Sequence, residues 1–501
     1  MKTIKIISRK SDLARIQAHL VSDKLKNEFS DLKIEFIFKS TLGDNDLTTP
    51  LNKMPDIGVF TNDIKKDLLS GRGDVAVHSW KDLPVDIEPG TFICGTLPRA
   101  DMRDMLFLKK SSKNKESLKI LSSSPRREKN LSEFLPEALP GKFRNISFHD
   151  VRGNIQTRLN KLADGQEDGL VVAKAAIDRI LGSPDEEFLE SRLQLLKITE
   201  SLNWMVLPLS ANPCAAAQGA LAIEIRSNDN ELKSMIEKIS DLPSYNRIQE
   251  ERVLLKSYGG GCHQKIGVSI EPLSIGEIKT VKGETEEGEE INERSFRPSN
   301  EIGDFFEGVN KNSFFPKAPD EQRFFKRAIV QESHEVLSDL KNTGLYISRS
   351  NALSDEILLD DSNCVWASGI QTWKSLARQN VWVNGCSDSL GENHSPEENP
   401  FEKMNWLKLS HSENKDNNKN ILATYKLVPV DLDPMIKNYT HYYWMSSTAF
   451  IRATSLFPEI LSARHATGLG QTYEAIQNLA PNRVMAFLNY EDWLSQVAEN
   501  S

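Results

Sequence analysis

The sequence contains no long hydrophobic run and few cysteines. No segment approaches the roughly 20 consecutive apolar residues that a membrane-spanning helix needs. Lysines interrupt the apolar residues 1–9, so we expect no signal peptide there. The cysteines are odd in number, dispersed and without metal-ligand spacing, which favours a reducing cytoplasm over a disulfide framework or a zinc site; they are Cys94, Cys214, Cys262, Cys364 and Cys386. We therefore expect a cytoplasmic protein with no membrane partner and no metal site.

The chain also lacks an excess of positive charge. Its formal net charge of −9 argues against general nucleic-acid binding, so any anion-binding site must depend on a local group of arginines. Hydrophobic residues make up 39% and charged residues 27%, which is the balance of a globular protein. A length of 501 residues predicts three or four domains.

Short apolar stretches alternate with amphipathic ones through the first half of the chain. The pattern predicts strands over 5–8, 34–38, 74–78, 119–122 and 169–173. Helical spacing predicts helices over 13–29 and 63–69, another after residue 122, and one that runs to residue 180. This rhythm predicts α/β layers with largely parallel strand pairing.

Polar side chains follow several of these strands, where ligands gather in parallel sheets. Five arginines stand at or just after strand ends, and they are Arg9, Arg126, Arg127, Arg152 and Arg158. A single arginine in such a place is more often a solvated residue at a helix start. Five of them on an acidic protein favour a ligand that bears several carboxylates or phosphates.

Two further residues suggest chemistry. Cys262 follows three glycines, which permit a tight turn and close approach to a ligand. A cysteine in such a loop is usually only a tolerated small residue, but its thiol could also be a nucleophile or an attachment point. Asp82 precedes Leu83-Pro84 and could be a turn former, or it could stabilise charge or handle a proton.

Seven motifs along residues 1–310 follow the order of one enzyme family. They are Ser8–Ala14, Gln17-Ala18, Val77–Pro84, Ser122–Arg127, Val151–Leu159, Gln218–Glu224 and Gly260–Cys262. With these motifs the sequence resembles the porphobilinogen deaminase (hydroxymethylbilane synthase) family. The resemblance implies an enzyme that condenses four porphobilinogen molecules, with loss of ammonia, and releases linear hydroxymethylbilane.

The resemblance also implies roles for individual residues. A dipyrromethane cofactor is expected as a thioether on Cys262, and Asp82 is expected to be the catalytic carboxylate. Further residues are expected to bind the cofactor: Lys81, Ser124, Arg126 and Arg127. The expected contacts with porphobilinogen and the growing pyrrole chain are Arg9, Ser11, Gln17, Lys53, Arg152, Asn154 and Arg158.

The family's architecture implies two α/β domains like those of periplasmic binding proteins and a small α+β domain. The expected ranges are 1–98 with 200–224 for the first, 99–199 for the second, and 225–312 for the third, which carries the cofactor cysteine. We expect a monomer.

Several positions depart from the family pattern. The loop over the active site usually carries two lysines, and here Lys53 is kept while Ile57 stands in place of the second. Pro125 replaces a leucine, Gly259 a glutamate, and Ala217 the glycine before Gln218. None of these changes removes a catalytic group, so we expect an altered rate rather than a loss of activity.

The remaining segment, 325–501, follows an expected domain junction at 310–325 and again predicts an α/β domain. Strands are expected over 344–349, 380–385, 406–409 and 442–445. Residues 442–450 and 468–473 resemble motifs of uroporphyrinogen-III synthase, which acts on the deaminase product. If the domain is active, the resemblance implies substrate contacts by Ser446, Ser447, Thr448 and Thr472. A main-chain donor role and a non-catalytic domain of the same fold remain open.

Two other classes of protein compete with the enzyme. A solute-binding module of similar architecture would predict an export signal and no need for Cys262 or Asp82. A purely structural protein leaves the arginines unexplained. The sequence therefore favours the enzyme.

Overall fold

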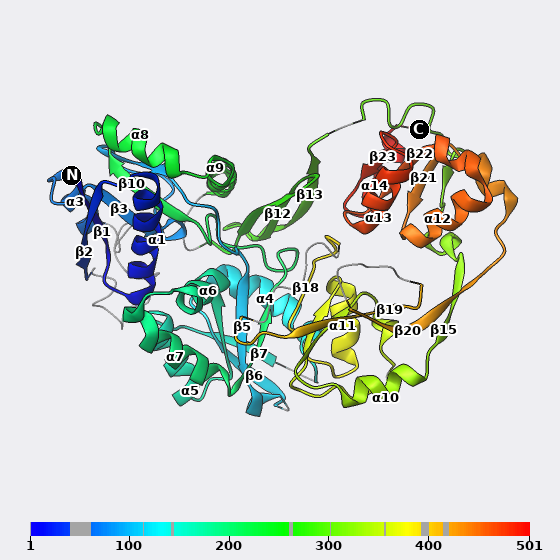
Figure 1. Cartoon of the computed structure of the whole chain (residues 1–501), viewed down its shortest axis with the longest axis horizontal. Helices are drawn as coiled ribbons and strands as arrows, with labels where there is room; N and C mark the ends of the chain where they lie inside the picture. Colours follow the sequence, from blue (N-terminus) through cyan, green and yellow to red (C-terminus); the bar gives the residue numbers. More distant parts are fainter. Residues whose placement is uncertain are drawn as a thin grey trace. The chain divides into compact units, whose positions relative to one another are not determined.

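The computed structural model describes residues 2–40, 62–113, 115–141, 145–259, 264–300, 302–354, 357–391, 400–413 and 420–500 (Figure 1). The chain divides into two compact units. Unit 1 comprises Met1–Pro136, Gly141–Ile270 and Lys279–Arg294, and unit 2 comprises Glu137–Pro140, Glu271–Ile278 and Ser295–Ser501. No helix among the described residues has the length and apolar character needed to cross a membrane.

The first sheet of unit 1 has five strands in the order β2-β1-β3-β10-β4. The strands are β1 (Lys2–Arg9), β2 (Leu32–Lys39), β3 (Val75–Ser79), β4 (Thr91–Gly95) and β10 (Leu221–Arg226). Strand β1 pairs in parallel with β2 and β3, whereas β10 runs antiparallel to β3 and β4. The expectation of largely parallel pairing is therefore wrong for β10. The chain re-enters this sheet where β3 ends, since Trp80 N–H donates to Ala220 O at 3.1 Å, and so β10 must run in the opposite direction.

Helices α1 (Asp12–Glu28), α3 (Asn62–Leu69) and α8 (Asn230–Ile239) accompany this sheet (Figure 1). Apolar residues of α1 at helical spacing, such as Ile16, Val21 and Leu25, are buried, whereas Leu20 is exposed. Val21 and Leu25 pack in one core cluster with Ile6 of β1 and Ile223 of β10. The predicted elements 5–8, 13–29, 34–38, 63–69 and 74–78 are thus confirmed, with ends shifted by a few residues.

The second sheet repeats this arrangement in the order β7-β6-β8-β5-β9. The strands are β5 (Asp104–Lys109), β6 (Ser117–Leu121), β7 (Asn145–His149), β8 (Gly169–Ala173) and β9 (Leu202–Val206). Strand β6 is parallel to β7 and β8, and β5 is antiparallel to β8 and β9. Because β9 pairs with β5, residues 202–206 complete the second sheet, although the expected boundary at residue 200 assigns them to the first domain.

Helices α4 (Pro125–Ala138), α5 (Ile155–Asp164), α6 (Lys174–Gly182) and α7 (Leu189–Thr199) belong with the second sheet. Helix α9 (Leu242–Ser257) then leads toward a three-stranded sheet of β11 (Gly267–Leu273), β12 (Gly276–Glu284) and β13 (Glu290–Pro298). The mixed α/β class is confirmed.

Unit 2 holds two further sheets. The smaller has the order β14-β21-β22-β23, and its described pairs are all parallel. Its strands are β14 (Phe314–Phe315), β21 (His441–Trp444), β22 (Arg464–Thr467) and β23 (Val484–Ala486), with helices α12 (Ser447–Leu456), α13 (Gln471–Leu479) and α14 (Tyr490–Glu499). Strand β14 lies inside the segment expected to be a domain junction, and its two phenylalanines are buried.

The larger sheet of unit 2 is inserted in sequence between β14 and β21, and its order is β15-β20-β19-β16-β17-β18. Its strands are β15 (Phe325–Ile329), β16 (Thr343–Ile347), β17 (Cys364–Ala367), β18 (Gly385–Cys386), β19 (Asn405–His411) and β20 (Asn420–Pro429), with helices α10 (Glu332–Asp339) and α11 (Ile370–Arg378) (Figure 1). Only β15 is antiparallel to its neighbour among the described pairs.

The strand expected over 380–385 is wrong, because only Gly385 joins β18. Asn380 has φ +62° and turns the chain at the end of α11, where Val381 N–H donates to Leu376 O. The other strands expected in this part of the chain are confirmed, apart from shifts at their ends.

Candidate active site

The candidate residues of unit 1 lie where strands of both sheets end. Arg9 ends β1, and Lys81 and Asp82 lie in a 3₁₀ turn, η2 (Trp80–Asp82), directly after β3. In the second sheet, Ser124 follows β6, and Arg152 and Asn154 follow β7. Asp82 is exposed, Lys81 and Arg158 are half-buried, and Arg126, Arg127 and Arg152 are buried.

A buried carboxylate that the sequence analysis missed forms the base of this region. Asp104, the first residue of β5, has no exposed surface. Its Oδ2 lies 2.8 Å from Arg126 Nη2, and its Oδ1 lies 2.6 Å from Arg127 Nη2. Two neutral donors complete its coordination, because Gln218 Nε2 and Asn212 Nδ2 each donate to it at 2.9 Å.

This coordination fixes the charge of Asp104. Burial alone would raise the pKa of Asp104, but the charges of Arg126 and Arg127 hold the pKa well below its usual range. The two guanidinium groups also donate to main-chain oxygens, Arg126 to Pro213 O at 2.7 Å and Arg127 to Val171 O at 3.0 Å. Their Nε–H groups have no partner among the described residues. Each arginine is thus held rigidly by the protein and keeps one donor unused.

Lys81 is coupled to the same network. Its Nζ donates to Gln218 Oε1 at 3.0 Å, so Gln218 joins Lys81 to Asp104. Burial, followed by the charge of Arg127, lowers the pKa of Lys81 to about 8, against the opposing effects of Asp82 and Asp104. Burial is therefore the main cause of the lowered pKa of Lys81.

Arg158 connects the remaining arginines to Asp82. Its Nε donates to Gly153 O at 2.8 Å. Burial, followed by the charge of Arg127, lowers its pKa to about 10; Asp82 opposes this shift, whereas Arg152 and Arg9 add to it. The charges of Arg9, Arg127, Arg152 and Asp82 thus all lie close enough to Arg158 to act on it.

Three candidates have structural contacts of their own. Asn154 is the N-cap of α5, where its Oδ1 accepts from Thr157 N–H at 2.8 Å. Gln17 is buried in α1 and makes a hydrogen bond with Ser79 Oγ at the end of β3. Ser11 precedes α1 as its N-cap residue without a side-chain capping bond.

The serines after β6 divide into two roles. Ser123, which the sequence analysis passed over, bridges to the end of β7 because its Oγ donates to Val151 O and accepts from Val151 N–H, both at 2.8 Å. Ser124 is half-buried at the start of α4, where its carbonyl accepts from Glu128 N–H at 3.1 Å.

Lys53 and Cys262 lie outside the described residues. The other four cysteines are described, and none of them is in a disulfide. Burial raises the pKa of Cys94 to about 11 and that of Cys214 and Cys364 to about 12, and Cys386 is buried. These four thiols are poor nucleophiles where they lie.

In unit 2, the four candidate residues gather at one sheet edge. Ser446 is the N-cap of α12, after β21, and its Oγ accepts from Ala449 N–H at 3.2 Å. Ser447 and Thr448 begin α12, and Thr472 lies in the first turn of α13, after β22. Because β21 and β22 are parallel neighbours, the two helix N-termini share an edge, and all four side chains are half-buried.

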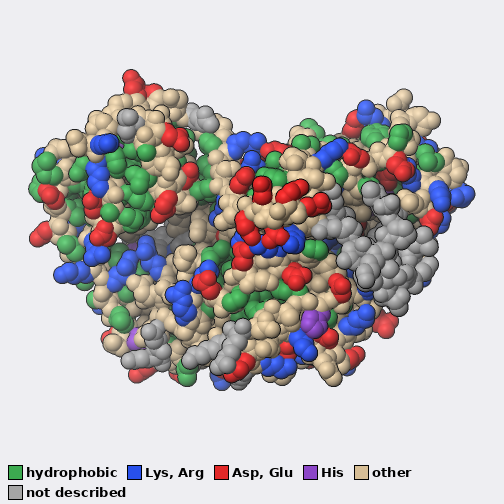
Figure 2. Space-filling model, turned by 180° about the vertical axis from the view of Figure 1, so that it is seen from behind, with side chains coloured by type: hydrophobic (Ala, Val, Ile, Leu, Met, Phe, Trp, Pro, Cys, Tyr) green, Lys and Arg blue, Asp and Glu red, His purple; other side chains and the backbone are tan. Residues whose placement is uncertain are grey.

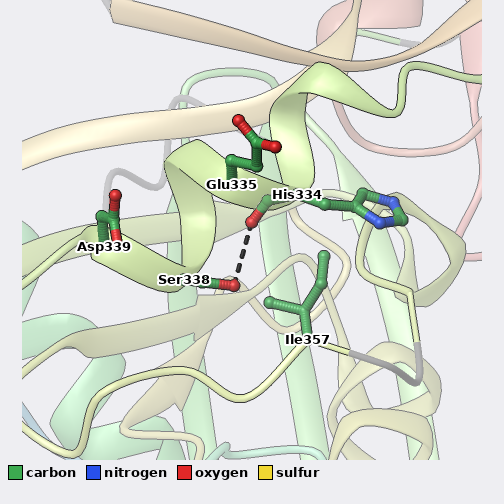
Figure 3. A pocket seen from close by; sticks show the side chains of 5 residues that line it. All are labelled: His334, Glu335, Ser338, Asp339 and Ile357. Carbon is green, nitrogen blue, oxygen red and sulfur yellow. Dashed lines mark hydrogen bonds between the residues drawn. The ribbon is translucent and has the colours of Figure 1, made fainter.

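Two other features do not coincide with the candidates. A shallow pocket at α10 is lined by His334, Glu335, Ser338, Asp339 and Ile357, and Ser338 Oγ donates to His334 O within the helix (Figure 3). His19, Asp185 and Glu187 could together hold a metal ion, but Arg15 already pairs with Glu187, so these groups form an ion-pair contact. On the face seen in Figure 2, acidic and basic side chains are interspersed.

Comparisons with known proteins agree with the motif order. The family model described as "Porphobilinogen deaminase, dipyromethane cofactor binding domain" matches residues 4–234. A porphobilinogen deaminase of Nostoc sp. is 34% identical over 270 residues, covering 54% of this chain and 78% of the relative. One from Caldicellulosiruptor saccharolyticus is 35% identical over 271 residues, covering 54% and 84%. One from Chlorobium phaeobacteroides is 31% identical over 351 residues, covering 68% and 99%.

Proposed function

We propose, since this chain belongs to the porphobilinogen deaminase family, that it builds its product on a dipyrromethane held covalently by Cys262. The N-terminal part is a porphobilinogen deaminase, a transferase of tetrapyrrole biosynthesis. The observation that supports the assignment of residues is the grouping of Asp82 with three arginines, Arg9, Arg127 and Arg152, whose charges all act on Arg158. In this proposal the enzyme condenses four porphobilinogen molecules and then releases hydroxymethylbilane.

The residues match the charge of such a reaction. Each pyrrole carries an acetate and a propionate, so the growing chain is a polyanion that Arg9, Arg152 and Arg158 can hold with planar guanidinium groups. In each condensation the aminomethyl C–N bond of the incoming porphobilinogen breaks as ammonia leaves. A C–C bond then forms between its methylene carbon and the free α-carbon of the terminal pyrrole of the bound chain, and that α-carbon loses its proton. Asp82 opposes the positive charge that develops on the pyrroles.

The cofactor would lie against the network at Asp104. When bound, the dipyrromethane supplies the pyrrole α-carbon to which the first substrate is joined. Lys81 Nζ and the unused Nε–H groups of Arg126 and Arg127 are donors for its carboxylates. Ser124, at the start of α4, would add a hydroxyl. Because Asp104 already holds both arginines in place, they would bind the cofactor without large movement.

The state of the other cysteines supports Cys262 as the attachment point. The four described thiols are buried or have raised pKa values, so each favours the unreactive protonated form. Denatured protein should give the coloured dipyrromethane reaction with Ehrlich's aldehyde reagent, and Cys262→Ala should give neither colour nor activity. A matched Cys94→Ala variant should keep both. An active Cys262→Ala enzyme would overturn the proposal.

The strand arrangement supports the proposed domain division in outline. The first domain, 1–98 with 200–224, would contain β1–β4 and β10, and the second, 99–199, would contain β5–β8, with β9 adjoining it. The third, 225–312, would contain β11–β13 and Cys262. The remaining domain, 325–501, would contain β15–β23.

For that last domain we propose cyclisation of the product to uroporphyrinogen III. Ser446, Ser447, Thr448 and Thr472 lie at two adjacent helix N-termini, which favour anionic groups. A fused second enzyme would shorten the time in which the unstable linear product cyclises spontaneously. Oxidised reaction products separated by isomer should contain mainly uroporphyrin III. Uroporphyrin I alone would instead identify a non-catalytic domain of the same fold.

A further inference from the structure

The six-stranded sheet of unit 2 reverses its winding at one point. From β16 the chain proceeds to β17 and then β18 on one side, and it returns to place β19 on the other side of β16. Strands β16 and β19 are parallel, with Ile347 opposite Leu409 at their carboxyl ends. In open α/β sheets, ligands bind beyond the carboxyl ends of strands at such a reversal.

An arginine and a histidine lie where the sheet reverses its winding, at the carboxyl ends of β16 and β19. Arg349 lies two residues beyond the end of β16, and His411 is the last residue of β19. His411 pairs in register with Tyr425 of β20, which in turn pairs with Ile329 of β15. On that last strand, Arg327 lies 5.9 Å above the ring of Tyr425, measured from Cζ to the ring centroid.

The charges of Arg327 and Arg349 influence each other and the pKa of His411. Burial, followed by the charge of Arg327, lowers the pKa of Arg349. Burial also lowers the pKa of His411; Glu413 opposes this shift, and Lys408, Arg349 and Arg327 add to it. Neither Arg327 nor Arg349 forms an ion pair with a carboxylate in the part of the chain that the structure describes. Both residues keep solvent-accessible surface, although neighbouring atoms partly enclose Arg349. The two guanidinium groups thus repel each other, and no described carboxylate is paired with either of them.

His411 contributes a buried ring nitrogen without a hydrogen-bond partner among the described residues. His411 is only 9% exposed, and its ring centroid lies 6.0 Å from that of Tyr425. Its buried Nδ1 has no hydrogen-bond partner among the described residues. A buried ring nitrogen without a partner costs free energy unless a ligand completes it.

We infer that Arg327, Arg349 and His411 form a binding site for a carboxylate group of an organic polyanion. The two guanidinium groups offer planar pairs of N–H donors, which match a carboxylate. The imidazole adds a nitrogen at the base. The site lies at a different sheet from Ser446–Thr448 and Thr472, so a ligand with several carboxylates could use it as a separate anchor. The inference depends on the proposed function only for the choice of polycarboxylate.

Uroporphyrin I, a stable compound with eight carboxylates, is a suitable probe. With the intact chain labelled at histidine, the NMR signal of His411, assigned with a His411→Asn variant, should shift and saturate as uroporphyrin I is added. The double variant Arg327→Met/Arg349→Met should need at least about tenfold more probe for the same shift, because two charge-assisted contacts are lost. The matched control Lys326→Met changes an exposed cation on the same strand and should leave the titration unchanged.

The outcomes separate the inference from the proposed function. An unshifted His411 signal, or a shift that the double variant does not weaken, overturns the inference. Inorganic phosphate that shifts the signal at the same concentration as uroporphyrin I overturns the assignment to a polycarboxylate. The isomer ratio of the reaction products tests cyclisation independently. If uroporphyrin I is the sole product but the His411 signal still shifts with the probe, the cyclisation proposal is wrong and the inferred binding site stands.

Discussion

Asp104 begins strand β5 and is followed by the apolar run Met105–Leu108, and its carboxylate pairs with two buried arginines. Arg126 and Arg127 come from α4, while Asn212 and Gln218 come from the segment that returns to the first sheet. One buried carboxylate thereby ties together parts of the chain that are more than 100 residues apart. It positions the two arginines that we propose to hold the cofactor, without touching a reacting atom.

Asp104→Asn should strongly destabilise the protein. The variant removes the carboxylate that pairs with both Arg126 and Arg127 and leaves these two guanidinium groups buried without it, which costs about 3–5 kcal/mol of unfolding free energy. Urea unfolding measures the loss. The control is Asp86→Asn, an exposed carboxylate paired with Lys256, which should cost less than about 1 kcal/mol. Equal effects of the two substitutions would contradict the role of Asp104.

The stabilising effect of Asp104 should also depend on pH. Because the folded-state pKa of Asp104 is lowered, its ionised form contributes stability above its unfolded pKa of about 4, and this contribution is lost as the pH falls below that value. The difference in unfolding free energy between wild type and Asp104→Asn should therefore narrow from pH 6 to pH 3. A constant difference would show that the charge of Asp104 is not what stabilises the fold.

Lys81 should lose its proton at a lower pH than an ordinary lysine. Its pKa of about 8 lies below the usual value of about 10.4 because of burial and the charge of Arg127. In protein freed of its cofactor, trace labelling with acetic anhydride should reach half of its maximum near pH 8 at Lys81. The exposed Lys326 is the reference in the same sample. Labelling of Lys81 that rises only with that of Lys326 would contradict this environment.

At the residue scale, the sequence predicted the arginines better than their partners. Arg9, Arg126 and Arg127 follow predicted strands, and Arg152 and Arg158 lie in the motif Val151–Leu159. Three of the five act on a fourth, Arg158. Asp104 could have been suspected, since a charged residue that opens the apolar run Met105–Leu108 needs a buried partner. Its four donors come from two other segments, α4 and the segment before β10, and no local pattern reveals them.

Ser446 shows that a residue expected from the sequence to bind a ligand can also stabilise a secondary-structure element. Its Oγ caps α12, so part of its hydrogen-bonding capacity serves the helix. Ser446→Ala should lower the unfolding free energy by about 1 kcal/mol, whereas Ser446→Asn, another good N-cap, should lose much less. Thermal or urea unfolding of the two variants measures this difference. If Asn restores the stability but not the uroporphyrin III yield, the hydroxyl also serves the substrate.

The helices and strands predicted correctly from the sequence are those with a clear pattern of apolar residues. The buried face of α1 and the apolar runs of β1, β3 and β8 appear within a few residues of their expected places. Strand direction was less accessible, because β5 and β10, the first strands after the chain crosses from one sheet to the other, run antiparallel to both of their neighbours. The segment 380–385 looked like a strand, but the left-handed Asn380 places the end of a helix there instead.

At the scale of the whole molecule, buried ion pairs join segments that are distant in sequence. Arg99 forms two bonds to Glu251 of α9, at 2.6 and 2.9 Å, and the same carboxylate accepts from Ala217 N–H and Ile270 N–H. Glu251 thus ties α9 to β11 and to the segment before β10. Sequence alone could not give this link, since its four participants span more than 150 residues.

Glu251→Ala should therefore destabilise unit 1 as a whole. The loss leaves Arg99 and two main-chain N–H groups buried without their acceptor, which should cost about 3–5 kcal/mol. The exposed Glu237→Ala on α8 is the matched control and should change the stability by less than about 1 kcal/mol. Chemical unfolding followed by circular dichroism distinguishes the two. A mild effect at Glu251 would mean that the segments are held by other contacts.

The central claim is that this chain builds pyrroles on its own covalent primer at Cys262, and peptide mass spectrometry tests it most directly. Protein made in cells should be digested with and without prior addition of porphobilinogen. The account predicts a dipyrromethane adduct on the peptide that contains Cys262, and further single-pyrrole additions to that peptide after substrate is added. An unmodified Cys262 peptide in active enzyme, or an adduct on Cys94 or Cys214 instead, would contradict the account.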